Sequence, residues 1–444
     1  MPRLILGHTT ERSVKIWVRG DERWPVAFVD VLDSADRKTS PTKVLELNSE
    51  EFWTDVSTWE GLSPNRPYRV KVSFGKSSTA IEHERIRDAY TEGRFRTFPT
   101  ESSAAAFTFL LGSCNLHSLG VIKNPDKPWA RVSEVSSAND SRFMIHCGDQ
   151  IYADIPFYPQ PDPSFYRRKY LDAWDDCRTA RAFLTQTPQY MILDDHEIIN
   201  NFDEDMSLGS VDVIACRNAA MKAYWEFQHK HNPDTFNPGQ PRQYYYSFSF
   251  GATKFFVLDT RYRRSSSSGQ MIDTTQFQSL KSWLVENVDQ LKFIVTSVPF
   301  IGQVKRPGND KWCSPCFAQQ RADLFDFLHK NEISKTVFLT GDMHTSYYAK
   351  AKLENDDRSI IIHELMSSPI NQFTPDTELQ ESYEPVSSLI TPSGIKIVCK
   401  IVPRSFFGNH SNIMAISVNG DLVRYKIFRT TDSGSAKVSG SFKP

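Results

Sequence analysis

The sequence predicts an α/β protein preceded by an all-β domain, and three observations support this prediction. Apolar and polar residues alternate strictly in stretches of the first hundred residues, which is the pattern of half-buried antiparallel strands. From Phe107 onward, short apolar runs alternate with helical patterns. A chain of 444 residues is also too long for one ordinary core, so two domains are expected.

The N-terminal part is expected to be a β-sandwich. Ser13–Arg19 and Tyr68–Phe74 show the alternation most clearly. Tyr68 follows a Gly-Leu-Ser-Pro turn, a setting in which a tyrosine hydroxyl often bonds back to the chain at a sandwich corner. A last strand is predicted over Gly93–Pro99, before a short polar linker. We therefore predict an Ig-like sandwich over residues 1–99.

Helical and hairpin signals follow in the longer second part. Phe277, Leu280 and Leu284 recur at the spacing of one helix face, so a helix is expected from Thr274 onward. It lies between two apolar runs and completes a predicted β-α-β unit. A second helix is predicted over Val213–Phe227. Near the end of the chain, alternating runs flank an Asn-Gly pair, which strongly predicts a β-hairpin.

Five short apolar runs each end on residues that can bind a metal ion or act beside one. Such runs, bounded by turn residues, are typical of buried strands. In open α/β sheets the functional residues gather at the carboxyl ends of such strands. The repeated pattern therefore predicts a metal-dependent hydrolase. The five segments are Gly112–Cys114, Gly148–Tyr152, Asp194–Glu197, Asp259–Arg261 and Gly341–His344.

The residue types in these segments form an anionic ligand set. Asp149 can bridge two ions, and Tyr152 lies close enough in sequence for its phenolate to reach the same ion. Cys114 offers a thiolate. Thiolate, phenolate and carboxylate together suit a ferric or other strongly Lewis-acidic ion better than Mg²⁺ alone. The predicted metal ligands are Cys114, Asp149, Tyr152, Asp195, Asp342 and His344.

His196 is the predicted catalytic residue. It can project toward the leaving group, be held protonated by a carboxylate, and donate a proton to the leaving oxygen. Arg261 follows a strand end and is well placed to bind a phosphate group. The basic stretch Lys305–Gly308 is expected to border the site.

Each of these residues also has a structural interpretation. Cys114 could be a small buried hydrophobe, and Tyr152 could be an aromatic residue packed in the core. His196 could pair with Glu197 inside the core, and Arg261 could form a surface ion pair. The five repeats favour the metal site over these alternatives, with Arg261 nearly balanced between the two interpretations.

Taken in order, the motifs resemble those of the PhoD-like alkaline phosphatases, a branch of the calcineurin-like metallophosphoesterases. The likeness runs from Cys114 to His344 and includes Asn201, and the N-terminal part looks like that family's leading domain. The resemblance implies a four-layer α-β-β-α sandwich over residues 104–444. It also implies Fe(III) beside Ca²⁺ or another divalent metal, with Arg261 and Asn201 binding substrate.

The expected function is hydrolysis of phosphate monoesters or diesters by a metal-bound hydroxide, with His196 protonating the leaving group. A serine or cysteine esterase using Ser113 or Cys114 is disfavoured because the Gly-x-Ser-x-Gly elbow is missing. The other alternative is a catalytically inactive protein of the metallophosphoesterase fold that binds a protein or glycan. The intact His196 and His344 argue against it.

Composition limits the partners. The net charge is −1, whereas nucleic-acid and anionic-membrane surfaces need a basic excess. The expected partner is therefore a small-molecule or polymeric phosphate ester. No signal peptide or membrane-spanning run is recognised, and the seven cysteines fit thiols in a reducing compartment. A cytoplasmic location is expected, and no oligomeric state is predicted.

Overall fold

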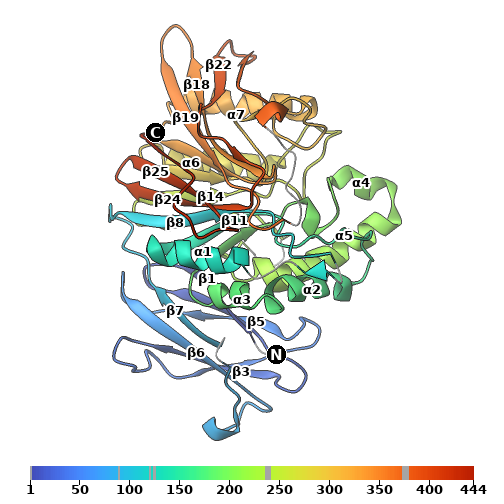
Figure 1. Ribbon diagram of the computed structural model, residues 1–444, viewed down its shortest axis with the longest axis vertical. Coiled ribbons are helices and arrows are strands. Elements are labelled where there is room, and N and C mark those ends of the chain that lie inside the picture. The colour runs from blue at the N-terminus through green and yellow to red at the C-terminus, as the bar shows by residue number, and fades with distance from the viewer. Residues whose placement is uncertain (1–2, 89–90, 120–121, 124–126, 236–241, 373–379) are drawn as a thin grey trace.

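The computed structural model describes residues 3–88, 91–119, 122–123, 127–235, 242–372 and 380–444. Figure 1 shows the N-terminal strands in blue at one end of the molecule, next to helices α1 (Lys127–Ala138) and α3 (Arg178–Leu184). Two large sheets make up most of the remainder. The chain therefore has a mixed α/β fold.

The N-terminal strands form two antiparallel sheets that share one apolar core. The first sheet has the order β1 (Arg3–Thr9), β2 (Val14–Arg19), β5 (Thr54–Trp59). The second has the order β4 (Lys43–Glu46), β3 (Val26–Leu32), β6 (Pro67–Gly75), β7 (Glu92–Arg96). The predicted tyrosine corner is confirmed, because the Tyr68 hydroxyl accepts a hydrogen bond from the Ser63 amide at 2.9 Å.

Strand β2 differs from its prediction. The alternation in its sequence predicts one exposed face, but all six residues of β2 are buried. The Lys15 ammonium donates to the Asn232 carbonyl at 2.9 Å, and Arg19 forms an ion pair with Asp175. The polar face is buried because it packs against the second part of the chain. Alternation along one strand cannot distinguish water from polar groups that a distant segment supplies.

The first large sheet has six strands, and three of the predicted apolar runs lie in it. Strands β8, β11 and β12 run parallel to one another. The predicted hairpin is confirmed as β24 and β25, joined at Asn419 and Gly420. The order is β12 (Gln189–Ile192), β11 (Ser141–Cys147), β8 (Phe107–Gly112), β24 (Asn412–Asn419), β25 (Leu422–Arg429), β26 (Val438–Phe442).

The second large sheet has nine strands and holds the other two runs, in β14 and β17. Strands β14, β15, β17 and β19 are parallel. The order is β13 (Tyr246–Phe250), β14 (Thr253–Val257), β15 (Lys292–Val295), β17 (Thr336–Thr340), β19 (Ser359–Met366), β18 (Thr345–Glu354), β22 (Lys396–Ile401), β21 (Val386–Ile390), and β23 (Phe407–Gly408) pairs with β18. Two short ribbons pair β9 (Ser118–Leu119) with β10 (Ile122–Lys123) and β16 (Gln303–Val304) with β20 (Tyr383–Glu384).

Both predicted helices are present in the structure. Helix α6 (Thr274–Glu286) begins after Asp273, whose carboxylate accepts the Gln276 amide at 2.7 Å. It connects the parallel strands β14 and β15, which confirms the β-α-β unit. Helix α5 (Val211–Tyr224) continues into a π-helical turn over Trp225–His229. The described residues also form α-helices α2 (Pro163–Tyr170), α4 (Glu204–Gly209) and α7 (Ala318–Lys330), and a second π-helical turn over Leu171–Asp175.

Aromatic side chains fill the space between the two large sheets. Phe109 and Phe143 from the six-stranded sheet contact Phe255 from the nine-stranded sheet, with ring centroids 5.6 and 5.5 Å apart. Helices α6 and α7 contribute to a core cluster with the nine-stranded sheet, and α1 and α3 to one with the six-stranded sheet. In the described part of the chain, no helix has the length and apolarity that crossing a membrane requires.

Candidate metal centre

The predicted ligands lie at the carboxyl ends of parallel strands from both large sheets. Asp149 follows β11 and Asp195 follows β12 in one sheet, and Asp342 follows β17 in the other. Carboxylate oxygens of these three residues and of Asp194 lie within 4.8 Å of one another. A second group with the same spacing is Asp149, Asp195 and His196. The two sheets thus bring together residues almost two hundred positions apart.

Cys114, Tyr152 and His344 adjoin this acidic group. The Cys114 thiol lies 3.2 Å from Asp149 Oδ2, and the Ser368 hydroxyl donates to Cys114 Sγ at 3.1 Å. The Tyr152 hydroxyl lies 3.1 Å from His344 Nε2. All six predicted ligands therefore lie in one neighbourhood, although the oxygens that lie closest together belong to the four aspartates.

The backbone is strained at several of these residues. Positive φ angles occur at Cys114 (59°), Asp149 (55°), Asn201 (55°), Asp342 (70°) and His344 (49°). The left-handed region costs a non-glycine residue on the order of 1–3 kcal/mol and is concentrated at functional sites. Apart from Asn201, these residues stand in the segments that directly follow β8, β11 and β17.

Gly148 permits the closest approach of two of these strand ends. Its φ is +90°, and a Cβ atom at this position would lie 2.4 Å from the Asp194 Cβ. Any other residue would push β12 away from β11. A glycine is therefore required where the two aspartate segments meet.

The acidic group carries more negative charge than its surroundings neutralise. Burial raises the pKa of Asp149 well above its usual range, and Asp195 and Asp194 raise it further although His196 opposes the rise. Burial also raises the pKa of the Cys114 thiol, as does Asp149. Asp194 Oδ2 and Asp195 Oδ1 accept no hydrogen bond within the described ranges. Buried acceptors and like charges of this kind fit a bound cation.

Arg261 does not occupy its predicted position. Its side chain is fully buried, and the guanidinium donates from Nε to Asp194 Oδ1 at 2.6 Å and from Nη1 to Asp310 Oδ1 at 2.5 Å. The expected contact with substrate is therefore corrected: Arg261 neutralises Asp194 from behind the site. The sequence places Arg261 after a strand end, but it does not show that the side chain turns inward. The carboxylates that attract it come from other segments of the chain.

Lys311 and Asp310 belong to the centre and were missed by the sequence analysis. The Lys311 ammonium forms ion pairs with both Asp310 and Asp342. Asp310 in turn accepts from Arg261 and Arg264. The only available signal was the basic stretch Lys305–Gly308, which lies just before this pair in the sequence.

A cavity of about 480 Å³ opens beside the centre. Lys311 and Asp310 line it together with Arg306, Pro307 and Gly308, as expected for a basic stretch that borders the site. Asn201 lines the same cavity, and its side chain is exposed. The backbone N–H of Asn201 donates to Asp195 Oδ2 at 2.5 Å, which fixes this loop to the centre.

His196 is held by Asp154, not by Glu197. His196 Nδ1 lies 2.7 Å from Asp154 Oδ1, and the imidazole stacks on Tyr152 with ring centroids 4.1 Å apart. Glu197 instead accepts the amides of Asp149 and Gln150 at 3.0 and 2.6 Å. Asp154 follows the predicted segment Gly148–Tyr152 by two residues, but nothing in its spacing identified it as the partner of His196.

The fold is similar to two solved phosphatase structures. A structure of PhoD superposes with a TM-score of 0.76 at 18% identity, covering 99% of this chain and 90% of that chain. Purple acid phosphatase PPD1 from yellow lupin (Lupinus luteus) seeds gives a TM-score of 0.62 at 13% identity, covering 100% of this chain and 74% of that chain. Identities this low show a shared fold alone. A comparison with curated proteins finds no match.

The sequence itself matches a phosphatase family. The model of the family described as PhoD-like phosphatase matches residues 123–395, a range that includes Asp149, Asp195, His196 and Asp342. Together with the acidic group, this match indicates a metal-dependent hydrolase of phosphoric esters. The chain belongs to the PhoD-like phosphatase family.

Proposed function

We propose that this chain hydrolyses phosphate monoesters or diesters, with metal ions held by the acidic group and His196 as the general acid. One observation carries the proposal. A buried group of four aspartates lies beside a histidine that a further carboxylate orients. Balanced structural ion pairs do not leave such an excess of negative charge at the ends of strands.

The donor set also indicates the kind of metal. The proposed ligands are Cys114, Asp149, Tyr152, Asp195, Asp342 and His344. We propose Fe(III) on the thiolate and phenolate side, and Ca²⁺ or another divalent ion among the carboxylates, because hard oxygen donors prefer such ions. When bound, the ions would supply Lewis acidity and lower the pKa of a water molecule.

His196 is suited to deliver a proton. Burial by itself lowers the pKa of His196, but Asp195, Asp149 and Asp154 together raise it to about 10. Since Nδ1 faces Asp154, the opposite ring nitrogen is the one that can donate to a leaving oxygen. Asp154 is a positioning residue that fixes the ring and favours its protonated form.

The neighbouring cavity provides the substrate side of the proposal. Asn201, Arg306 and Lys311 line it on the open side of the aspartates. An amide and two cations can bind the charged oxygens of a phosphate ester. We propose that this cavity takes the small-molecule or polymeric phosphate ester, with Asn201 as a substrate-binding residue.

We also propose the finer features of the architecture. These are an Ig-like sandwich over residues 1–99 and a four-layer α-β-β-α domain over residues 104–444. Two separate core clusters support the four layers, one between α6, α7 and their sheet and one between α1, α3 and the other sheet.

The test combines metal analysis with hydrolysis of 4-nitrophenyl phosphate and bis(4-nitrophenyl) phosphate. We expect bound metal and turnover of at least one of these esters, and the ratio of the two rates assigns the monoester or diester preference. A ferric ion on Tyr152 should give a visible charge-transfer band that Tyr152→Phe removes. Bound metal without turnover of either ester would instead favour the inactive binding protein.

A further inference from the structure

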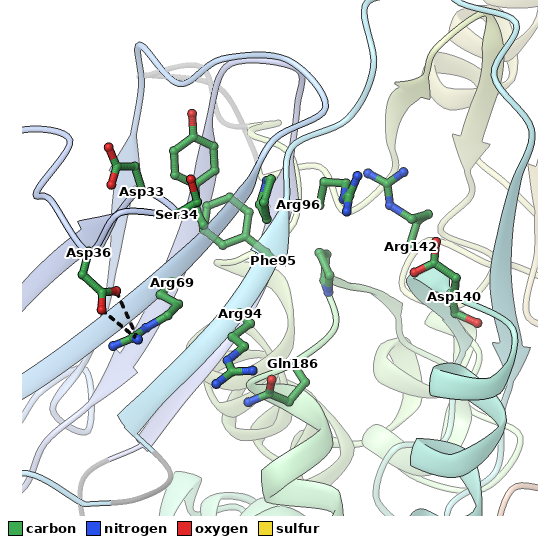
Figure 2. Close-up of a pocket in the computed structure, with 14 residues that line it drawn as sticks. Asp33, Ser34, Asp36, Arg69, Arg94, Phe95, Arg96, Asp140, Arg142 and Gln186 are labelled. Atoms are coloured by element: carbon green, nitrogen blue, oxygen red, sulfur yellow. Dashed lines mark hydrogen bonds and ion pairs between the residues drawn. The ribbon is translucent and has the colours of Figure 1, made fainter.

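A second cavity, of about 470 Å³, lies between the N-terminal strands and the six-stranded sheet. Its walls come from β6 and β7 on one side, and from the segments that lead into β11 and β12 on the other. Figure 2 shows these residues around a common space. Four arginines line the cavity: Arg69, Arg94, Arg96 and Arg142.

Two of these arginines come from one strand face. Arg94 and Arg96 alternate with the buried Phe95 on β7, so both project from the same side of the sheet. Within the residues that the structure describes, neither side chain has an ion pair or hydrogen bond with the protein. Both guanidinium groups are exposed and available to a ligand.

Arg142 meets them from the opposite wall. It is only partly exposed, donates to the Thr97 carbonyl at 3.0 Å, and lies over the Phe250 ring at 5.1 Å. Figure 2 shows the guanidinium groups of Arg96 and Arg142 directed toward one another. Burial and the charge of Arg96 together lower the pKa of Arg142 to about 10, although Asp140 opposes the fall. Two cations therefore face each other with no anion between them.

The acidic residues of the cavity do not neutralise this charge. Asp36 forms an ion pair with Arg69 at 3.1 Å, and Asp33 pairs with Arg37 at 2.8 Å. Asp140 lies two residues before Arg142 and raises its pKa, but it forms no ion pair within the described ranges. Once the paired groups are set aside, three arginines remain against one aspartate.

The cavity is separate from the metal centre. Arg142 stands at the amino end of β11, whereas Asp149 follows its carboxyl end. Seven strand residues at ~3.3 Å each put the two ends roughly 20 Å apart. Pro188 and Asp194 stand in the same relation at the two ends of β12. An anion in this cavity would therefore not contact the catalytic groups.

We propose that this cavity is a binding site for a small oxyanion with two or more negative charges, held by Arg94, Arg96 and Arg142. Guanidinium groups bind phosphate and carboxylate oxygens in pairs of parallel hydrogen bonds. An anion between Arg96 and Arg142 would replace their repulsion with attraction. It would also connect the N-terminal sheets to the amino ends of β11 and β12.

The test compares the double variant Arg94→Gln/Arg96→Gln with Arg66→Gln, an exposed arginine that does not line the cavity. Equilibrium dialysis at constant ionic strength uses inorganic phosphate, pyrophosphate and succinate as probes. We expect the wild type and Arg66→Gln to bind one more anion per chain than the double variant, or to bind it at least about tenfold more tightly. The phosphate and succinate arms decide which oxyanion class fits. Equal stoichiometry and affinity in all three proteins, for every probe, would overturn the proposal.

Thermal unfolding of Arg96→Gln alone gives a second readout. Without added anion, Arg96→Gln should raise the midpoint because the repulsion on Arg142 is gone. With phosphate or pyrophosphate, the wild type should gain stability by mass action, and the variant should gain less. A variant that is less stable than the wild type without anion, with an undiminished response to anion, would contradict the proposal.

Discussion

Two regions of this molecule bury charged side chains, and they do so in opposite ways. At the metal centre, Asp149, Asp194, Asp195 and Asp342 converge, and burial and mutual repulsion raise the pKa of Asp149. Between the N-terminal sheet and the helices of the second part, buried charges instead meet opposite charges. Asp175 forms ion pairs with both Arg3 and Arg19 in this region, and the distance from Arg3 Nε to Asp175 Oδ1 is 2.9 Å.

The difference separates a binding site from a structural contact. Glu226 accepts from Arg167 Nε at 2.7 Å, and Lys15 pairs with Asp234 at 2.5 Å. These contacts are neutralised by the protein itself, whereas the aspartates at the strand ends are neutralised only in part, by Arg261 at Asp194 and by Lys311 at Asp342. A buried charge cluster that the fold leaves unbalanced indicates a ligand of opposite charge.

The largest expected effect comes from removing a ligand. Asp149→Ala and Cys114→Ala should each lose bound metal. The rate of hydrolysis should fall by far more than the ~10–100-fold that is typical when a residue that only hydrogen-bonds to a metal ligand is replaced. Metal content and rate are measured on the same preparation, with Asp356→Asn as an exposed control. Full metal content and rate in Cys114→Ala would show that the thiol is structural.

Next in size is the effect at His196. His196→Ala should keep its metal and lose ~10²–10⁴-fold in rate, with a smaller loss on a nitrophenyl ester than on an alkyl ester, whose leaving group depends on protonation. Asp154→Asn should lower the pKa of His196, because this carboxylate raises it, and so move the loss of activity at high pH to lower pH. Equal losses on both esters, or lost metal, would assign His196 another role.

The balanced region should respond in stability rather than in activity. Asp175→Asn removes the carboxylate that Arg3 and Arg19 share, which should cost ~3 kcal/mol of unfolding free energy while metal content stays constant. Asp149→Asn should instead increase the unfolding free energy of the metal-free protein, because it removes a charge that the neighbouring aspartates repel. Denaturant unfolding of both variants is the measurement. If both variants lost the same unfolding free energy, the two regions would not differ in how their buried charges are balanced.

The smallest expected effect concerns pH. Burial lowers the pKa of His229 and of His231 to about 3, whereas an unfolded histidine has a value near 6.5. As the pH falls below ~6.5, the unfolded chain takes up protons that the folded chain does not, so stability falls, by on the order of 2 kcal/mol per histidine near pH 5. His229→Gln should reduce this acid sensitivity. Replacing the exposed His83 by Gln should leave the sensitivity unchanged.

Much of this organisation could be predicted from the sequence, because it depends on local patterns. Helix α6, the hairpin at Asn419 and Gly420, and the strands before the five motifs follow from periodicity and turn chemistry. The prediction that the five motifs lie close together followed from one topological rule, that the carboxyl ends of parallel strands lie at the same edge of a sheet. The roles of individual ligands stay predictions.

The missing parts depend on contacts between distant segments. Arg261 turns inward because Asp310, forty-nine positions later, accepts from it. Lys311 pairs with Asp342 from a loop whose sequence has no hydrophobic periodicity, and Asp154 contacts His196, which lies forty-two positions later. Strand β2 has two buried faces because the second part of the chain covers one of them. None of these contacts is visible in any short window of sequence.

The contact of β2 has a consequence for how such a protein can be divided. The Trp17 indole donates to the Glu226 carbonyl at 2.7 Å, and Ile5 and Trp17 belong to the same core cluster as Tyr170 and Phe227. The N-terminal sheet is therefore not an exchangeable module. Recombination or proteolysis that separates the first hundred residues from the rest would expose the apolar side chains of this shared cluster on both fragments, so we expect the two parts to fold as one unit.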